Sequence, residues 1–234
     1  MEKTQIEVTP EELEALKRFK IRATKKNKPK VKKDKYPKSG YRKDPENLHM
    51  YVNDVRILTP REYRALRAVI PTDEHKTAFD ILLITGMRYA EYLRLYDNHI
   101  WYNENRNIIH LDEFAQLKHK RSQKERTIHP LPYGFSYLMK AFWNGHKPPL
   151  EATWNQNMQR WAKKAGINPY GMSVKTTRKT IESWQISAGI NESTVCLRAG
   201  HDSVTSLQHY QGLAFSDSEQ RDIKDQLTEW RFLK

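Results

Sequence analysis

The sequence has little of what marks secreted, membrane-spanning or zinc-stabilised proteins. Its 234 residues include one cysteine, which excludes an internal disulfide, and no Cys and His residues stand at zinc-ligand spacing. No stretch approaches about 20 uncharged apolar residues, the length that a transmembrane helix needs. The first residues also lack the apolar segment of a signal peptide. We therefore expect a protein that binds no metal, does not enter a membrane and stays in the cytoplasm.

Acidic residues are too few to balance the basic ones. The chain has 41 Lys and Arg against 28 Asp and Glu, a formal net charge of +13. Residues 17–43 hold 14 of the basic residues and one acid, Asp34, whereas the two kinds are equal in number elsewhere. Such a run suits a polyanion, either nucleic acid or an anionic membrane surface. The alternative is a solvated tail whose charge keeps the protein soluble.

Helix-start signals divide the chain into two parts. Thr-Pro-Glu-Glu at 9–12 predicts a short helix, and the Lys-rich stretch after it is interrupted by proline and glycine. The same signal recurs as Thr-Pro-Arg-Glu at 59–62, followed by apolar residues at helical spacing. We therefore expect residues 1–55 to form an N-terminal helix plus a basic arm or linker. Residues 56–234 are expected to form the main domain, with a C-terminal tail from about residue 211.

The main domain is predicted to be mainly α-helical with a small antiparallel β-sheet, an α+β fold. The strand candidates are short and rich in Ile, Trp and Tyr, at 99–102, 107–111 and 126–129. Helical patterns begin near residues 59, 72, 88, 133, 153, 175, 192 and 203. Between the last two strand candidates lies the polar, basic segment 118–124, which is predicted to be a hairpin loop.

Two local patterns each contain an arginine that suits an anion. Gly86 is predicted to end one helix and Arg88 to open the next, where free backbone N–H groups would favour an anion beside the guanidinium. Lys175 and Arg178 are three residues apart and share one helix face. Two cations this close repel unless an anion lies between them, and a phosphate is the obvious candidate. Alone, each pattern also fits ordinary solvated surface cations.

Two further patterns supply groups that take part in proton transfer or nucleophilic attack. A lysine in the hairpin 118–124 can reach a phosphate or a leaving oxygen. The Gly200-His201 turn can present an imidazole, and Tyr210 follows nine residues after the histidine, at the predicted end of a short helix. Alone, these features also fit a charged hairpin tip, a structural histidine and an ordinary surface or core tyrosine.

Together, and in this order, the four patterns resemble the tyrosine recombinase (phage integrase) family. Thr-Gly-Met-Arg-Tyr-Ala-Glu-Tyr-Leu at 85–93 resembles the family's first-arginine box. The stretch from Lys175 to Arg178 resembles its second-arginine box, and Gly200-His201 its Leu-Gly-His segment. The Lys-rich hairpin stands where the family keeps its catalytic lysine, and Tyr210 lies at the family's usual offset from the histidine. The resemblance spans about residues 56–210 and implies the fold of the family's catalytic domain.

The resemblance implies a site-specific DNA recombinase that needs no metal, nucleotide or other cofactor. Tyr210 would attack the scissile phosphate, and the product would be a 3′-phosphotyrosyl link. A hairpin lysine would protonate the leaving 5′-oxygen; we favour Lys120, and Lys118 and Lys124 remain alternatives. Glu91 is expected to be a buried partner that orients Arg88. The implied catalytic residues are Arg88, Lys120, Lys175, Arg178, His201 and Tyr210.

Double-stranded DNA is the expected partner, contacted mostly through its backbone, and copies of the chain are expected to assemble on it as a dimer or tetramer. The C-terminal residues Trp230, Phe232 and Leu233 would dock on a neighbouring copy or fold back onto their own core. The residues expected to contact DNA are Lys25, Lys26, Lys28, Lys30, Lys32, Lys33, Lys118, Arg121, Lys124 and Lys179.

The sequence departs from the family pattern in two places. Lys175 stands where most members have histidine, which resembles integrases of archaeal viruses and plasmids. Only about 55 residues precede the catalytic part, too few for the separate core-binding domain of the family. Either the chain is truncated or the basic arm does part of the clamping. Two other functions stay open, a type IB topoisomerase and a non-catalytic DNA-binding or assembly module.

Overall fold

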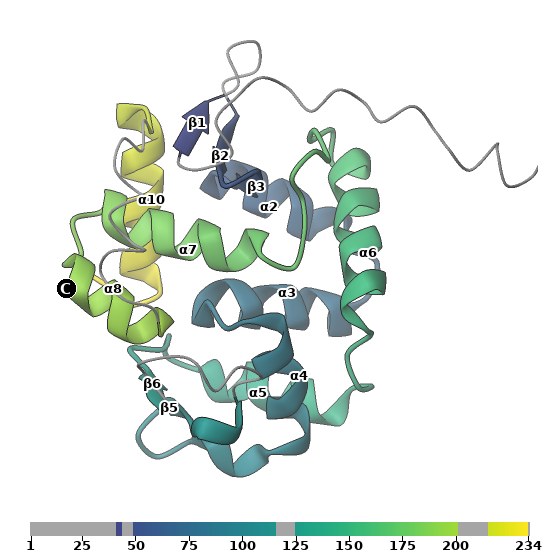
Figure 1. The fold of residues 1–234 in the computed structure, drawn as a ribbon, viewed down its shortest axis with the longest axis vertical. Helices are drawn as coiled ribbons and strands as arrows, with labels where there is room; N and C mark the ends of the chain where they lie inside the picture. The colour runs from purple at the N-terminus through teal and green to yellow at the C-terminus, as the bar shows by residue number, and fades with distance from the viewer. Residues whose placement is uncertain (1–40, 44–48, 116–124, 201–214, 234) are drawn as a thin grey trace, which may run out of the picture. The chain divides into compact units, whose positions relative to one another are not determined.

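The computed structural model describes residues 41–43, 49–115, 125–200 and 215–233 (Figure 1). This part of the chain is mainly helical and carries two small antiparallel sheets. The predicted fold class is therefore confirmed. Among the described helices, none combines the length and apolar character that a bilayer crossing requires.

The first sheet precedes the first predicted helix of the main domain and was not expected from the sequence. Its strands are β1 (Tyr41–Lys43), β2 (Met50–Val52) and β3 (Val55–Ile57), in the order β1-β2-β3. Asn53 and Asp54 join β2 to β3 with φ values of 49° and 60°. Two left-handed residues in succession are typical of a type I′ turn, which suits the twist of a two-residue hairpin.

The next two helices begin where the sequence predicts. α2 (Pro60–Val69) has Thr59 as its N-cap, and the Glu62 backbone N–H donates to Thr59 Oγ1 at 3.2 Å while the Thr59 N–H donates to Glu62 Oε2 at 3.0 Å. α3 (Asp73–Thr85) is capped by Thr72 and ends at Gly86, whose φ of 63° is left-handed. The reciprocal capping of α2 and the glycine stop of α3 depend on residues within about one helical turn, so both can be predicted from the sequence.

The middle of the chain builds the second sheet and two more helices. α4 (Tyr89–Asp97) is followed by the 3₁₀ turn η1 (His99–Trp101), so most of the first strand candidate is a turn. The strands β4 (Tyr102–Asn103), β5 (Ile108–Leu111) and β6 (Arg126–Ile128) form an antiparallel sheet in sequence order, with the turn η2 (Glu113–Ala115) after β5. α5 (Phe135–Asn144) and α6 (Glu151–Lys164) follow.

The last helices include the one at the centre of the packing, α7 (Thr176–Ser187). It packs against β3, α3, α8 (Glu192–Ala199) and α10 (Asp217–Glu229) (Figure 1). Leu58, just after β3, donates its backbone N–H to Thr180 Oγ1 at 3.0 Å and accepts from Trp184 Nε1 at 2.7 Å. These two bonds to one residue fix both the position and the rotation of α7.

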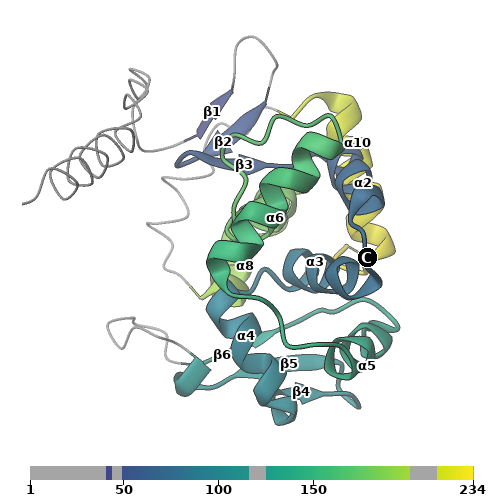
Figure 2. The same ribbon diagram turned by 90° about the vertical axis from the view of Figure 1, so that its right-hand side faces the viewer.

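The C-terminal residues lie on the core of their own chain. α10 packs against α7 and, as Figure 2 shows, lies beside α2. Trp230, just after α10, is 8% exposed and packs on Tyr63 and Trp184, with ring centroids 5.9 and 6.1 Å away. Phe232 lies under the Arg198 guanidinium, 4.7 Å from the ring centroid. In the structure these residues therefore fold back onto their own core, which is the second of the two expectations.

Candidate active site

Arg88 stands at the junction between α3 and α4, as the sequence predicts. Its Nη1 donates to Glu91 Oε1 at 2.6 Å and its Nη2 to the carbonyl oxygen of Gly200 at 2.9 Å. Its backbone N–H also donates to Glu91 Oε2 at 2.8 Å. The Arg88 side chain is 24% exposed.

Arg178 reaches the same place from α7. Its Nη1 donates to the carbonyl oxygen of Gly86 at 3.0 Å and its Nη2 to that of Ala199 at 2.7 Å. Its Nε lies 2.9 Å from Glu182 Oε1, one helical turn along α7. All three contacts hold the planar fork in one orientation, which a lysine ammonium would not reproduce.

The two guanidinium groups therefore meet at the C-terminal end of α8. They bind the carbonyl groups of consecutive residues, Ala199 and Gly200. A helix C-terminus carries partial negative charge, which stabilises cations placed there. Burial, together with the charge of Arg178, lowers the pKa of Arg88 to about 10 against the opposing effect of Glu91. Arg88 thus remains charged at neutral pH.

Glu91 is buried, with a side chain 2% exposed, as expected for a partner of Arg88. It also accepts two hydrogen bonds from Arg126 on β6, at 2.8 Å from Nη1 and 2.6 Å from Nη2. Burial raises the pKa of the Glu91 carboxyl, but Arg126, Arg88 and Arg178 together lower it to about 2. Glu91 is therefore a fixed anion and no candidate for a general base at neutral pH.

The second-arginine stretch differs from the expectation in one respect. Lys175 is exposed at the N-cap of α7, whereas Arg178 is buried and paired with Glu182. Lys179 Nζ lies 3.3 Å from the other oxygen of Glu182, and its side chain is 16% exposed. Glu182, one turn along α7, thus places a carboxylate beside Arg178 that the sequence analysis did not include. The expected contact of Lys175 and Arg178 with a phosphate stays a prediction.

Gly200 closes α8 in a conformation that only glycine adopts easily. Its φ is 69°, and a Cβ built on it would lie 2.8 Å from Arg126 Nη1 and 2.9 Å from Arg126 Cδ. The backbone that presents the Gly200 carbonyl to Arg88 thus packs directly against Arg126. Any side chain at this position would separate them.

Several predicted residues lie outside the part of the chain that the structure describes. Of the predicted site, the structure brings Arg88, Glu91 and Arg178 together, and Lys175 lies at the start of the same helix as Arg178. The residues outside the described ranges are Lys118, Lys120, Arg121, Lys124, His201, Tyr210, and in the arm Lys25, Lys26, Lys28, Lys30, Lys32 and Lys33.

Sequence reasoning missed two buried arginines beside this site, Arg126 and Arg198. Arg126 is 3% exposed and Arg198 6% exposed, and Arg198 donates to the carbonyl oxygens of Pro130 and Ile84 at 2.9 and 2.8 Å. A signal for Arg126 was present, because it alternates with Ile128 and so shares the inward face of a strand. A charge on that face indicates a buried ion pair.

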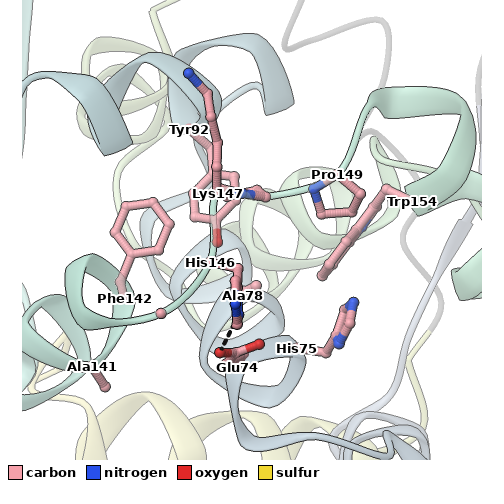
Figure 3. A pocket seen from close by; sticks show the side chains of 12 residues that line it. Glu74, His75, Ala78, Tyr92, Ala141, Phe142, His146, Lys147, Pro149 and Trp154 are labelled. Carbon is pink, nitrogen blue, oxygen red and sulfur yellow. Dashed lines mark hydrogen bonds and ion pairs between the residues drawn. The ribbon is translucent and has the colours of Figure 1, made fainter.

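A cavity of about 70 Å³ lies elsewhere, between α3, α4 and the loop after α5 (Figure 3). Its walls include the rings of His75, Tyr92, Phe142 and Trp154, and an ion pair between Glu74 and His146 lies at 2.9 Å beside it. No residue of the predicted site lines it. The described residues contain no group of three side chains placed to hold a metal ion.

Comparisons with known proteins agree with the fold. The chain resembles a Tn1549 transposon integrase in complex with transposon right end DNA (17% identity, 74% of this chain and 65% of that chain, TM-score 0.54). It also resembles XerA recombinase (18% identity, 73% and 64%, TM-score 0.52). It further resembles a Tn1549 transposon integrase in complex with a circular intermediate DNA (16% identity, 93% of this chain and 80% of that chain, TM-score 0.56).

The chain spans 65% and 64% of the length of the first two of these structures. At such low identity the likeness shows the fold alone. No curated protein matches the chain. The sequence profile of the phage integrase family, however, matches residues 56–217. Because this match covers more than half of the 234 residues and includes the arginine site, the chain belongs to the phage integrase family.

Proposed function

We propose that the chain acts in site-specific DNA recombination, cutting a DNA strand and rejoining it through a covalent bond to Tyr210. The observation that supports this most is the convergence of the two arginines on the carbonyl groups that end α8. The next residue along the chain is His201, the histidine that the family resemblance implies.

The paired guanidinium groups suit a phosphodiester that gains negative charge as it reacts. Planar arginine forks bind phosphate oxygens bidentately, and here Arg88 and Arg178 are already oriented by protein carbonyls and carboxylates. Groups that are fixed before the reaction need no rearrangement when charge develops. Loss of one such donor typically lowers the rate by about 10²–10³.

Tyr210 is the proposed nucleophile because the family motif implies a phosphate held among fixed cations, and such surroundings activate a phenol. An unperturbed tyrosine, with a pKa of about 10, is a weak nucleophile at neutral pH, and nearby positive charge favours the phenolate. Attack forms the Tyr Oη–phosphorus bond as the bond to the 5′-oxygen breaks. We assign the proton for that oxygen to Lys120 in the hairpin. Lys175 and His201 add hydrogen bonds to the phosphate.

Double-stranded DNA is the proposed partner, and several copies of the chain would assemble on it to bring two cut strands together. Two of the similar structures are integrases in complex with DNA, which supports this choice. The charge surplus in residues 17–43 supports it as well. Binding through phosphates releases counterions, so affinity is expected to fall steeply with salt.

The test is covalent trapping on a nicked duplex that carries the element junction. The nick lets the short product strand diffuse away, so a protein–DNA adduct accumulates and is seen on a denaturing gel. Tyr210→Phe should remove the adduct, whereas Tyr137→Phe, at an exposed tyrosine of α5, should keep it. An adduct that persists in Tyr210→Phe would contradict the choice of nucleophile. Absence of any adduct from the unaltered chain would contradict the proposal as a whole.

A second duplex added to the same reaction separates recombination from topoisomerase activity. Joining of the trapped strand to the partner duplex is the expected result. Relaxation of supercoiled DNA without joining would instead favour the type IB topoisomerase. DNA binding without either reaction would favour a non-catalytic module.

A further inference from the structure

The Arg88 guanidinium is oriented by two groups, and both of these groups also contact Arg126. Its guanidinium binds the Glu91 carboxylate and the Gly200 carbonyl oxygen. Arg126 contacts Glu91 through two hydrogen bonds and packs against the backbone of Gly200. We propose that Arg126 is a positioning residue that sets the orientation of the Arg88 guanidinium through Glu91 and Gly200.

The contact with Glu91 fixes the plane of the carboxylate. Arg126 Nη1 and Nη2 bind Oε1 and Oε2 at 2.8 and 2.6 Å, which is the parallel two-bond geometry of arginine and carboxylate. Each of these oxygens then accepts one bond from Arg88, Oε1 from Nη1 and Oε2 from the backbone N–H. Because the carboxylate cannot rotate, both hydrogen bonds from Arg88 to Glu91 are fixed.

The contact with Gly200 fixes the other attachment. A Cβ on Gly200 would lie under 3.0 Å from two Arg126 atoms, so the Arg126 side chain fills the space directly beside this backbone. The same peptide region offers the carbonyl oxygen that Arg88 Nη2 binds at 2.9 Å. Arg126 therefore links β6 to the start of α4 and to the end of α8 at once.

Burial explains why this role needs arginine in particular. The side chains of Arg126 and Glu91 are 1% and 2% exposed, so little water can replace a lost bond. Removing one partner of a buried pair leaves an uncompensated charge. A lysine at 126 keeps the charge but offers a single ammonium, which cannot hold both carboxylate oxygens in the same plane.

The structure also offers a matched control in Arg198. It is buried to a similar degree, but it donates to the carbonyl oxygens of Pro130 and Ile84, which do not bind Arg88. Arg126→Lys and Arg198→Lys make the same chemical change at two buried arginines. If Arg126 only stabilises the fold, the two variants should affect Arg88 alike.

The first measurement follows Arg88 itself and does not depend on activity. In nitrogen NMR of the side-chain Nε–H groups, the Arg88 signal is assigned by its loss in Arg88→Lys. We expect Arg126→Lys to shift this signal and to speed its exchange with solvent, and Arg198→Lys to leave it in place. An unchanged Arg88 signal in Arg126→Lys, or equal changes in both variants, would overturn the proposal. So would an Arg126→Lys and an Arg126→Gln protein that both fail to fold while Arg198→Lys folds, because Arg126 would then be required for the fold as a whole.

The second measurement tests the consequence for catalysis and rests on the proposed function. Misplacement of a catalytic group by about 1 Å can cost roughly 100-fold, so we expect Arg126→Lys to slow covalent trapping by about 10- to 100-fold. In an Arg88→Lys background the same change should slow it by less than about threefold, since residues that act as a unit are not additive. Equal losses in both backgrounds would overturn the proposal. If the unaltered chain forms no adduct, the proposed function fails while the NMR result still decides the role of Arg126.

Discussion

The guanidinium of Arg178 on α7 donates a hydrogen bond to the carbonyl oxygen of Gly86, at 3.0 Å. Gly86 ends α3 and stands two residues before Arg88. This bond ties the central helix to the turn that carries the other arginine. Together with the bonds of Arg88 and Arg178 to the Gly200 and Ala199 carbonyls, it holds the two guanidinium groups near each other.

The turn itself should be sensitive to a side chain at Gly86. Gly86→Ala puts a Cβ in a left-handed conformation, with φ of 63°, and 3.0 Å from Ile181 Cγ2 on α7. Gly166→Ala is the matched control, because its φ is 72° and nothing lies within 4 Å of its Cβ position. Both should lose about 1–2 kcal/mol from the left-handed backbone. We expect Gly86→Ala to lose about 1 kcal/mol more from overpacking, as measured by urea unfolding. Equal losses would show that α7 yields freely at this contact.

Glu91 should make stability depend on acid pH. Burial raises its pKa, but the arginines lower it from an ordinary 4.5 to about 2, so the folded state binds fewer protons than the unfolded state. The stabilisation is present above pH 4.5 and is lost as the pH falls towards 2. The unfolding free energy of the unaltered chain minus that of Glu91→Gln should fall by about 3 kcal/mol between pH 6 and pH 2. Chemical denaturation of both proteins between pH 6 and pH 2 measures this difference in unfolding free energy. A difference that stays constant over this range would contradict a lowered pKa for Glu91.

Lys120 should matter only when the leaving oxygen needs a proton. Lys120→Ala is expected to slow cleavage of ordinary DNA by about 10²–10⁴, the usual contribution of general acid–base catalysis. A substrate with sulfur in place of the bridging 5′-oxygen has a leaving group that needs no acid, so it should restore the rate. No rescue would mean that Lys120 is not the general acid, and Lys118→Ala and Lys124→Ala would be tested in the same way.

The basic arm should set the salt dependence of DNA binding. Replacing Lys25, Lys26, Lys28, Lys30, Lys32 and Lys33 by alanine should reduce the slope of log affinity against log salt by up to about 5, at roughly 0.9 per phosphate contact. The control replaces Lys76, Lys140 and Lys147, which are paired with acidic residues on the described surface, and should leave the slope nearly unchanged. Fluorescence anisotropy at several salt concentrations gives both slopes. A slope insensitive to the arm would assign it the role of a solvated tail.

Features that depend on neighbouring residues could be predicted from the sequence, whereas features that depend on residues far apart in the chain could not. The starts of α2 and α3 and the stop at Gly86 depend on residues within one turn, and they lie where predicted. The strands β1 to β3 were missed because each has three residues and is stabilised by pairing with its neighbours. The candidate strand at 99–102 is mostly a turn, because its apolar residues suit either structure.

The site divides in the same way. The contact of Arg88 with Glu91 was expected from the resemblance to the family's first-arginine box, and the two residues stand only three positions apart at the start of α4. Glu91 and Arg126 are 35 positions apart, and no local sequence pattern at either residue predicts that they pair. The pairing of Arg178 with Glu182 was overlooked although the two are four residues apart on α7. Here the spacing was available, but the sequence analysis considered only the two cations Lys175 and Arg178 and left Glu182 out.

The most direct test of the central claim is to identify the residue that carries the DNA. The adduct trapped on the nicked duplex is digested with protease and nuclease, and the remaining nucleotide-linked peptide is sequenced by mass spectrometry. We predict a 3′-phosphate ester on Tyr210 in the unaltered chain, and its loss in a variant with both Arg88→Ala and Arg178→Ala. A phosphate on any other residue, or an adduct that forms equally well without the two arginines, would contradict the account.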